Sequence, residues 1–585
     1  MKRMRKMFGP LSVLMLLIVL SSTTALALAQ TTVKKTYGGT VVCTQGGDPA
    51  TLNPVLNTDQ IYLVQPYFDY LVECDYEGKI QPSLATKYEI SSDGLTYTFT
   101  LAQGVKFHDG KELTSEDVKF TYEKILDPKM GSGHRSQVDA ISQIEMPSKY
   151  VVVFRTSRPV PWLLDSMVDI GILPKHIYEK EDFLNTKYNY QVIGSGPFKL
   201  EQWLRLDRIV GVANKDYWRG RPYIDKLIFK VIPETAVALS AVESADADII
   251  SSQGTIGGFP MAHLERLQKN PSLSIELFPT LYLQKLYFTC DVPPFNNIKV
   301  RQAVAHAIDR KYIIDALLNK VAPKANAPWC AALSWALSPK WTDETYYRYD
   351  PEMAEKFLDE AGYKKAPDGI RFRTTIYATT GFRTEMSEVI RSMLARIGIE
   401  AKVESSDWTT YWTMIRFNHD KVNGMYTVYS RFSDPHMASQ YYHSSEVGGG
   451  GTNGMRYKNQ RLDDLIGKGK TTAEASQRAA IYKEIHDLIN TELPSFSLYE
   501  LPGVTVVNKR ISGVKSIKGA VCGTYVPSLW RDAWIPGEAV TTTVTPAKEP
   551  SADLTPMILV AVGGAIFGAV AVGVLLRMRK PHRSG

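Results

Sequence analysis

The sequence predicts a mixed α/β protein with at least two lobes. Its 585 residues are more than one simple core usually holds. In the C-terminal half, helical patterns alternate with strand patterns, and in the N-terminal half apolar and polar residues alternate around turn dipeptides. Together these three observations indicate layered sheets and helices in more than one unit.

The first part of the chain is predicted to be rich in strands. A strand ends at Cys43, and the loop GGDPATLNP leads from it into a helix-like segment around Tyr67. Apolar side chains alternate over residues 88–101 around an Asp-Gly pair, which predicts a hairpin. Residues 149–155 supply a further apolar strand.

The stretch GVKFHDGKELTSEDVKF, residues 104–120, has the pattern of a strand, a tight turn and a capped helix. Apolar and polar residues alternate at its start, which predicts the strand. Gly110 favours a tight turn because glycine accepts the positive φ that such turns need. Thr114, followed three residues later by an aspartate, resembles a helix capping box. We therefore interpret His108 and Asp109 as structural residues and not as a catalytic pair.

The rest of the chain alternates between helices and strands. GSGPF at residues 194–198 is predicted as a tight turn that starts a third region, which runs to a strand at 225–232. Residues 297–318 have a strong amphipathic helix pattern. Further helices are predicted at 350–361, 383–397, 408–417 and 474–490, and further strands at 371–377, 399–403 and 424–429.

The two ends of the chain are predicted to serve export and anchoring. Residues 1–29 combine basic residues, a short apolar run and small residues, as a secretory signal peptide does. Residues 557–576 are uncharged and as a helix would span about 30 Å, the thickness of the apolar core of a bilayer. Basic residues in the tail, 577–585, place it in the cytoplasm. The Thr- and Pro-rich stretch 537–556 has the composition of a stalk.

Charge and cysteine content exclude some classes of function. The net charge is +7, but residues 1–30 and 577–585 each hold four basic and no acidic side chains, so the remainder carries −1. A nearly neutral ectodomain has no electrostatic reason to bind nucleic acid. The five cysteines lack the CxxC spacing of zinc and redox sites, and outside the cell they allow one or two disulfides with at least one thiol left over. They are Cys43, Cys74, Cys290, Cys330 and Cys522.

No catalytic constellation is recognisable in the sequence. It lacks GxSxG, HExxH, GxxxxGK[ST] and the Rossmann glycine fingerprint. Asp434, His436 and His443 are residue types that bind metals, but they lie on a loop without supporting ligands, so we predict no metal site. An exported, aromatic-rich chain of this kind favours binding over turnover, with no catalytic residue and no cofactor. The alternative is an exported hydrolase such as a glycosidase, which would need two carboxylates facing one bond.

Several sequence blocks occur in order along residues 38–535. The longest is PSLATKYEISSDGLTYTFTLAQGVKFHDGKELTSEDVKF at 82–120. Shorter blocks are TLNP at 51–54, GSGPFKLEQW at 194–203, NKDYWRGRPYIDKLIF at 214–229, FNNIKVRQAVAHAIDR at 295–310, SDP at 433–435 and LPSFSLYE at 493–500. In these blocks the chain resembles the family 5 extracellular solute-binding proteins of ABC importers, the oligopeptide, dipeptide and nickel class. The C-terminal anchor is similar to that of some archaeal members, which carry sugars, so oligopeptide and oligosaccharide ligands both stay open.

The resemblance implies a bilobal, three-domain fold of the periplasmic-binding-protein class (type II), with a ligand cleft between the lobes and a hinge of two chain crossings. Domain I would comprise residues 38–76, 194–285 and 503–535, domain II would be inserted at 77–193, and domain III would span 286–502. The resemblance also implies a substrate-binding subunit that delivers its solute to ABC permease and ATPase subunits. With the predicted anchor, the ectodomain would lie at the cell surface.

The domain III loop departs from the family pattern. Peptide binders of the family place an aspartate four residues before the proline of this loop, where it pairs with the amino terminus of the ligand; here that position is Arg431. A guanidinium has no acceptor and repels an ammonium group, so we expect a ligand with hydroxyls or an anionic group there, with Asp434 steadying the loop. Aromatic residues nearby offer flat rings for sugars or peptide side chains. The predicted ligand-binding residues are Thr44, Gln45, Trp408, Tyr429, Arg431, Phe432 and Asp434.

Overall fold

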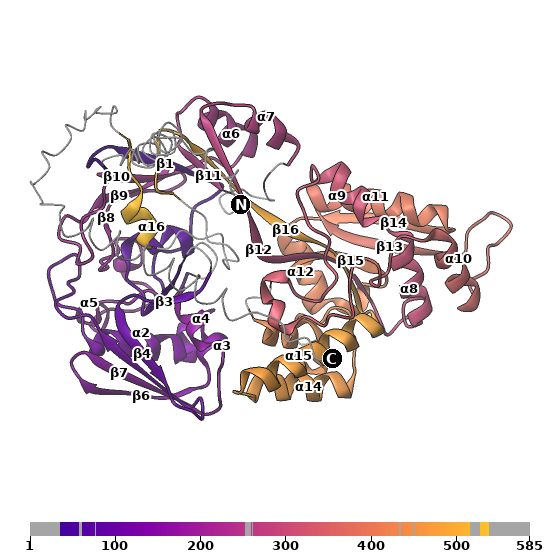
Figure 1. Ribbon diagram of the computed structural model, residues 1–585, viewed down its shortest axis with the longest axis horizontal. Helices are drawn as coiled ribbons and strands as arrows, with labels where there is room; N and C mark the ends of the chain where they lie inside the picture. The colour runs from indigo at the N-terminus through magenta and orange to yellow at the C-terminus, as the bar shows by residue number, and fades with distance from the viewer. Residues whose placement is uncertain are drawn as a thin grey trace, which may run out of the picture. The chain divides into compact units, whose positions relative to one another are not determined.

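The computed structural model describes residues 35–57, 61–75, 78–251, 259, 261–431, 434–448, 451–514 and 527–536 (Figure 1). All of them belong to one compact unit. The predicted signal peptide, stalk, membrane helix and tail lie outside the described residues. Within the described part of the chain, no helix is long and apolar enough to cross a membrane.

The main sheet has ten strands in the order β14-β13-β15-β12-β16-β11-β1-β10-β9-β8 (Figure 1). β1 pairs in parallel with β10 and β11, and β13 pairs in parallel with β14 and β15, while the other neighbours are antiparallel. This mixture of sheets and helices confirms the predicted α/β class. The strands are β1 (Thr40–Gln45), β8 (Phe198–Leu204), β9 (Arg208–Ala213), β10 (Lys226–Val231), β11 (Ile249–Ser251), β12 (Leu273–Phe288), β13 (Phe372–Thr379), β14 (Ile399–Ser406), β15 (Met425–Arg431) and β16 (Ser495–Asn508).

Two long strands in the middle of this sheet join its two halves. β12 and β16 pair antiparallel along most of their length, with a register shift between Pro279 and Leu283. The predicted crossings between domains I and III, at residues 285–286 and 502–503, fall inside these strands. Figure 1 shows the two strands side by side. An irregularity of this kind bends paired strands locally, so the pair has a point at which it can bend.

A separate antiparallel sheet, in the order β4-β5-β7-β6, lies in the region predicted as domain II. Gly94, in the turn between β4 and β5, has a φ of 70°, and the two strands pair, which confirms the predicted hairpin. The helix α2 (Ser115–Leu126) packs against β6 and β7 (Figure 1). The strands of this sheet and of the short pair before it are β2 (Val72–Cys74), β3 (Ile80–Pro82), β4 (Ala85–Ile90), β5 (Thr96–Leu101), β6 (Ile141–Ser148) and β7 (Val151–Thr156).

The stretch at residues 104–120 contains the turn and the capped helix predicted for it. Gly110 has a φ of 92°, and Thr114 forms a capping box with the first turn of α2. The segment before the turn makes a single bridge between Lys106 and Glu112 and not a full strand. Local turn and cap signals therefore predicted this part of the chain better than the alternation did.

The helices of the second half follow the prediction with one break. The predicted helix at 297–318 is two helices, α8 (Ile298–Ala307) and α9 (Arg310–Leu317). Asp309 caps the second, because its side chain accepts a hydrogen bond from the backbone N–H of Tyr312 at 3.0 Å. The other α-helices are α3 (Arg135–Val138), α4 (Leu163–Met167), α5 (Lys175–Tyr178), α6 (Thr235–Glu243), α7 (Leu264–Gln268), α10 (Pro351–Glu360), α11 (Phe382–Arg396), α12 (Trp408–Phe417), α13 (Ala438–Tyr442), α14 (Gln460–Thr471), α15 (Ala475–Glu492) and α16 (Pro527–Asp532). The short 3-10 helices are η1 (Ile61–Leu63), η2 (Gln65–Tyr67), η3 (Pro128–Met130), η4 (Lys187–Asn189), η5 (Met261–His263), η6 (Ala331–Ala336), η7 (His419–Lys421), η8 (Pro435–Met437) and η9 (Ser444–Glu446).

Three apolar clusters form the core of the described part. The first joins β1 and β10 to the four-stranded sheet and includes Tyr67 and Trp530. The second packs α8, α9 and α11 against β12 and β16, and the third packs α14 and α15 around Trp329. The four described cysteines are free thiols, and Cys522 lies outside the described residues.

Candidate functional site

Two regions far apart in sequence meet at a stack of two rings. Trp162 lies just before α4, in the region of the four-stranded sheet, and His436 lies in η8, beyond β15. Their ring centroids are 3.7 Å apart, their planes differ by 9°, and only 4% of Trp162 is exposed. We call the surrounding group the lobe junction. It comprises Arg158, Trp162 and Asp165 on one side and Asp434, His436 and Arg478 on the other.

Asp434 is held by an ion pair on its own side of the lobe junction. Arg478, on α15, donates to Oδ2 at 3.0 Å and to Oδ1 at 2.5 Å. His436 donates its backbone N–H to Oδ1 at 2.8 Å, and its Nδ1 lies 3.0 Å from the same oxygen. Burial alone would raise the pKa of Asp434, but the hydrogen bond with His436 and the charge of Arg478 outweigh it and lower this pKa to about 2. The ionised carboxylate therefore ties the loop to α15.

Asp165 faces the lobe junction from α4. Asp165 is exposed, and the surrounding protein and the negative charge of Asp434 raise its pKa above the ordinary value. Two guanidinium groups lie near the Trp162 ring, with Cζ of Arg158 at 5.9 Å and Cζ of Arg478 at 5.6 Å from its centroid. Contact between the two regions thus brings acidic, basic and aromatic groups together.

A row of polar and aromatic side chains crosses β15, β12 and β16. Tyr429 pairs with Gln284, which pairs with Tyr499, and directly opposed residues in antiparallel strands point to one face. Arg383, from α11, lies with Cζ 3.9 Å from the centroid of the Tyr429 ring and donates to Thr379 Oγ1 at 2.7 Å. The amide oxygen of Gln284 is buried and has no hydrogen-bond partner among the described residues.

Thr44 and Gln45 lie at the end of β1. The Oγ1 of Thr44 is 3.5 Å from the carbonyl oxygen of Ile249. Gln45 is fully buried, and neither polar atom of its side-chain amide has a hydrogen-bond partner in the described part of the chain. A buried amide without partners is costly, so this position suits a ligand that both donates and accepts hydrogen bonds.

The remaining predicted ligand contacts are placed only in part. Trp408 is the first residue of α12, and Asp407 caps that helix. Arg431 ends β15, with its backbone opposite Tyr282. The side chains of Trp408 and Arg431, and the whole of Phe432, lie outside the described part of the structure. Their contacts with a ligand stay predictions.

His108 and Asp109 make contacts between segments of the fold. Nε2 of His108 lies 3.0 Å from the carbonyl oxygen of Gly196, and its Nδ1 accepts the backbone N–H of Gly194 at 3.2 Å. Burial lowers the pKa of His108 to about 4, so its ring is neutral at pH 7. The carboxylate of Asp109 lies 2.7 Å from Nε2 of His176. His108 therefore supports the GSGPF turn.

Sequence reasoning missed Trp162, Arg478 and Arg383 as candidates. None of them stands in a motif, and His436 was considered only as a metal ligand. Among the described residues, no group of three or more His, Cys, Asp or Glu could hold a metal ion. The SDPH segment was the one available signal, because it marked the loop on which the lobe junction is built.

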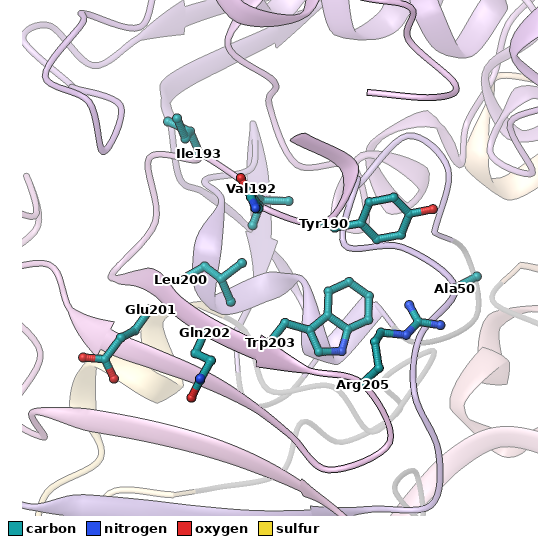
Figure 2. Close-up of a pocket in the computed structure, with 10 residues that line it drawn as sticks. Ala50, Tyr190, Val192, Ile193, Leu200, Glu201, Gln202, Trp203 and Arg205 are labelled. Carbon is teal, nitrogen blue, oxygen red and sulfur yellow. The ribbon is translucent and has the colours of Figure 1, made fainter. Parts of the chain in front are cut away.

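A cavity of about 810 Å³ lies between β8 and the segment at residues 190–193 (Figure 2). Tyr190 and Trp203 line it with their ring centroids 5.9 Å apart, and Arg205 lies beside Trp203 in Figure 2. The Nε1–H of Trp203 donates to Asp48 at 3.2 Å. The lining contains none of the predicted ligand-binding residues, so this cavity is separate from the candidate site.

The two halves of the main sheet are joined by β12 and β16, and aromatic and charged groups lie at the lobe junction. These features define a protein that binds a ligand between two lobes. The chain belongs to family 5 of the bacterial extracellular solute-binding proteins, whose middle-region model matches residues 79–449. The match confirms the family that the sequence blocks predicted.

Similar proteins cover most of the chain. It is 29% identical over 539 residues to the oligopeptide-binding protein AppA of Bacillus subtilis, covering 88% of this chain and 97% of that protein. The structure of AppA with a nonapeptide has a TM-score of 0.69 at 26% identity, covering 86% of this chain and all of that one. NikZ from Campylobacter jejuni, in complex with Ni(L-His), has a TM-score of 0.73 at 25% identity, covering 85% of this chain and 99% of that one. These likenesses confirm the bilobal binding-protein fold.

Proposed function

We propose that this solute-binding protein is the substrate-binding subunit of an ABC importer of the peptide class. The lobe junction carries the proposal, because Trp162 and His436 come from two regions that are joined through β12 and β16. Ligand favours a closed form only to the extent that it touches both lobes. Closure then excludes water and strengthens each buried polar contact, and the permease can recognise the closed form.

A peptide is the ligand class that we propose. AppA is named an oligopeptide-binding protein and its structure holds a nonapeptide, which supports this class by similarity. A peptide group offers one donor and one acceptor, which match the two unpartnered polar atoms of the Gln45 side chain. The ring of Tyr429 gives a flat apolar surface for side chains of varied shape. These features support recognition of backbone more than recognition of one sequence.

The carboxyl or hydroxyl groups of the ligand would meet Arg431. We place its guanidinium in the cleft, where its planar fork of donors suits a carboxylate. A free amino terminus would then bind elsewhere, because Arg431 repels a positive charge. Asp434 would keep the loop in position through its ion pair with Arg478.

The ectodomain would work outside the cell and bind its ligand without chemical turnover. Export would use residues 1–29, and residues 557–576 would anchor the chain, with residues 577–585 in the cytoplasm. The membership of an extracellular binding family supports the outward location. Protease added to intact cells should remove the ectodomain and spare the tail; survival of the ectodomain would contradict this topology.

A thermal-shift screen of the full chain tests the ligand class, with peptides, oligosaccharides and metal ions as separate arms. A ligand at a hundredfold excess over its Kd stabilises the native state by about 2.7 kcal/mol, and we expect this with peptides. Gln45→Ala should reduce the shift, while Gln202→Ala, in the separate cavity, should leave it unchanged. Peptide should be recovered intact by mass spectrometry. Stabilisation by oligosaccharides alone would refute the peptide class.

A further inference from the structure

We propose that Trp162 is a positioning residue for ligand capture, whose stack on His436 latches the two lobes together. In this role Trp162 sets the balance between open and closed forms and does not select the ligand. The inference rests on the proposed function, because it assumes that closure captures the ligand. The latch itself is a contact within the protein and can be tested without any ligand.

The His436 side of the latch is fixed by its own region. Asp434 accepts the backbone N–H of His436, and its Oδ1 also lies 3.0 Å from Nδ1 of the ring. The same carboxylate is held from behind by Arg478, only 7% of whose side chain is exposed. The ring orientation is therefore set by contacts that do not involve Trp162, so the imidazole forms a ready platform.

The Trp162 side is equally well supported. The carbonyl oxygen of Trp162 accepts a hydrogen bond from the backbone N–H of Ser166 at 3.2 Å, which fixes the start of α4. Arg158, near the indole, is held by Asp139 at 2.8 Å. Trp162 is also part of the apolar cluster that includes the four-stranded sheet. The indole is thus held within its own region.

A second contact extends the latch beyond the ring pair. The turn between β4 and β5 lies against the turn between α14 and α15: a Cβ built on Gly94 would lie 3.4 Å from Cβ of Ala473. This contact sits on the same two regions as the ring stack. The lobes therefore approach each other closely at two points, and at one of them Trp162 supplies a large aromatic surface.

Separating the lobes must break the stack and expose the indole to water. An aromatic pair adds about 0.5–1.5 kcal/mol to the effect of buried area, which corresponds to a factor of about 2 to 12 in the opening equilibrium. A residue that acts only through lobe closure does not touch the ligand, so the loss of Trp162 should change the affinity of every ligand by one common factor. A residue that touches ligand would instead change affinities unequally.

Hydrogen exchange of the full chain without ligand tests the latch. In His436→Ala we expect residues 159–168, in the other region, to exchange about 2- to 12-fold faster. In Trp162→Ala we expect the same for residues 434–442. The matched control is Trp203→Ala, which removes an indole from β8 and should leave both segments unchanged.

Each outcome decides for or against the latch. Faster exchange of residues 159–168 in His436→Ala, with normal protection of β13, supports the latch. This result holds even if Trp162→Ala disrupts the core of its own region. Trp162→Phe should fall between wild type and Trp162→Ala, because a smaller ring remains. Unchanged exchange of residues 159–168 in His436→Ala overturns the proposal. The test contains no ligand, so a protein that binds no peptide could still show the latch. Failure of the proposed function and failure of the latch are therefore distinguishable.

Discussion

Replacing Arg478 by alanine should destabilise the protein more than removing any surface cation does. Arg478 donates to both oxygens of Asp434, and the two side chains are 7% and 10% exposed. Loss of the guanidinium leaves a buried carboxylate that keeps its contacts with His436 and has Asp165 nearby, but has lost its cation. Removing one partner of a buried ion pair costs about 3–5 kcal/mol, because the other charge stays buried and uncompensated. We expect a loss of that size in the free energy of unfolding.

The pH dependence of stability gives the same experiment a second readout. The pKa of Asp434 is lowered to about 2, against an ordinary value of about 3.9 in unfolded chains. A lowered carboxyl pKa contributes stability that is present above the ordinary value and lost as the pH falls toward the folded value. Without Arg478, the pKa of Asp434 in the folded protein rises. Between pH 5 and pH 3 the Arg478→Ala variant should therefore lose less stability than the wild type loses.

Urea unfolding of the full chain at pH 7, pH 5 and pH 3, followed by circular dichroism, measures both effects. The matched control is Arg461→Ala, which breaks an ion pair with Glu484 whose side chains are 68% and 45% exposed. Exposed pairs contribute less than about 1 kcal/mol. If Arg478→Ala costs no more than Arg461→Ala at pH 7, the reasoning from burial is wrong.

Four further outcomes are expected. Gly110→Val should cost about 1–3 kcal/mol in thermal unfolding, because Gly110 has a φ of 92° that a β-branched residue does not accept. His108→Ala should lower the melting temperature and leave ligand affinity unchanged, since its ring bonds the backbone of the GSGPF turn; an affinity loss at normal stability would contradict this. Arg431→Ala should weaken binding about 10- to 150-fold by calorimetry with a peptide from the screen, as expected for a charged hydrogen bond, and unchanged affinity would make the arginine a surface charge. Burial lowers the pKa of His436, so its stack should hold above the ordinary pKa of about 6.5 and weaken below it. Hydrogen exchange above and below this pH tests the prediction. It is measured in an Asp165→Asn background, so that the titration of Asp165 does not contribute to the pH dependence.

Features that depend on a few neighbouring residues were predictable from the sequence. The capping box at Thr114 and the hairpin at Gly94 appear as expected, and α12 has the predicted bounds. In each of them the backbone partner lies within a few residues, so the signal is contained in a short stretch. The ordered blocks predicted the family, because they span most of the chain.

Features that depend on distant partners were not predictable in the same way. β12 and β16 were not predicted as strands, although they are long and pair with each other. The break between α8 and α9 was missed because apolar residues keep a helical spacing through it. The hydrogen bond from the cap residue Asp309 nevertheless starts a new helix there. The stack of Trp162 on His436 leaves no pattern in either segment, since each residue alone resembles ordinary core or loop.

The loop that begins at Asp434 takes part in the lobe junction as well as in the predicted ligand site. From sequence, Asp434 was a candidate ligand contact, yet its oxygens accept from Arg478 and from the backbone of His436. These bonds fix the loop from the protein side, and the same loop then presents His436 to Trp162. Loop position and lobe closure therefore depend on one carboxylate. A change at Asp434 should disturb the latch as well as the ligand, whereas a change at Arg431 should disturb only the ligand.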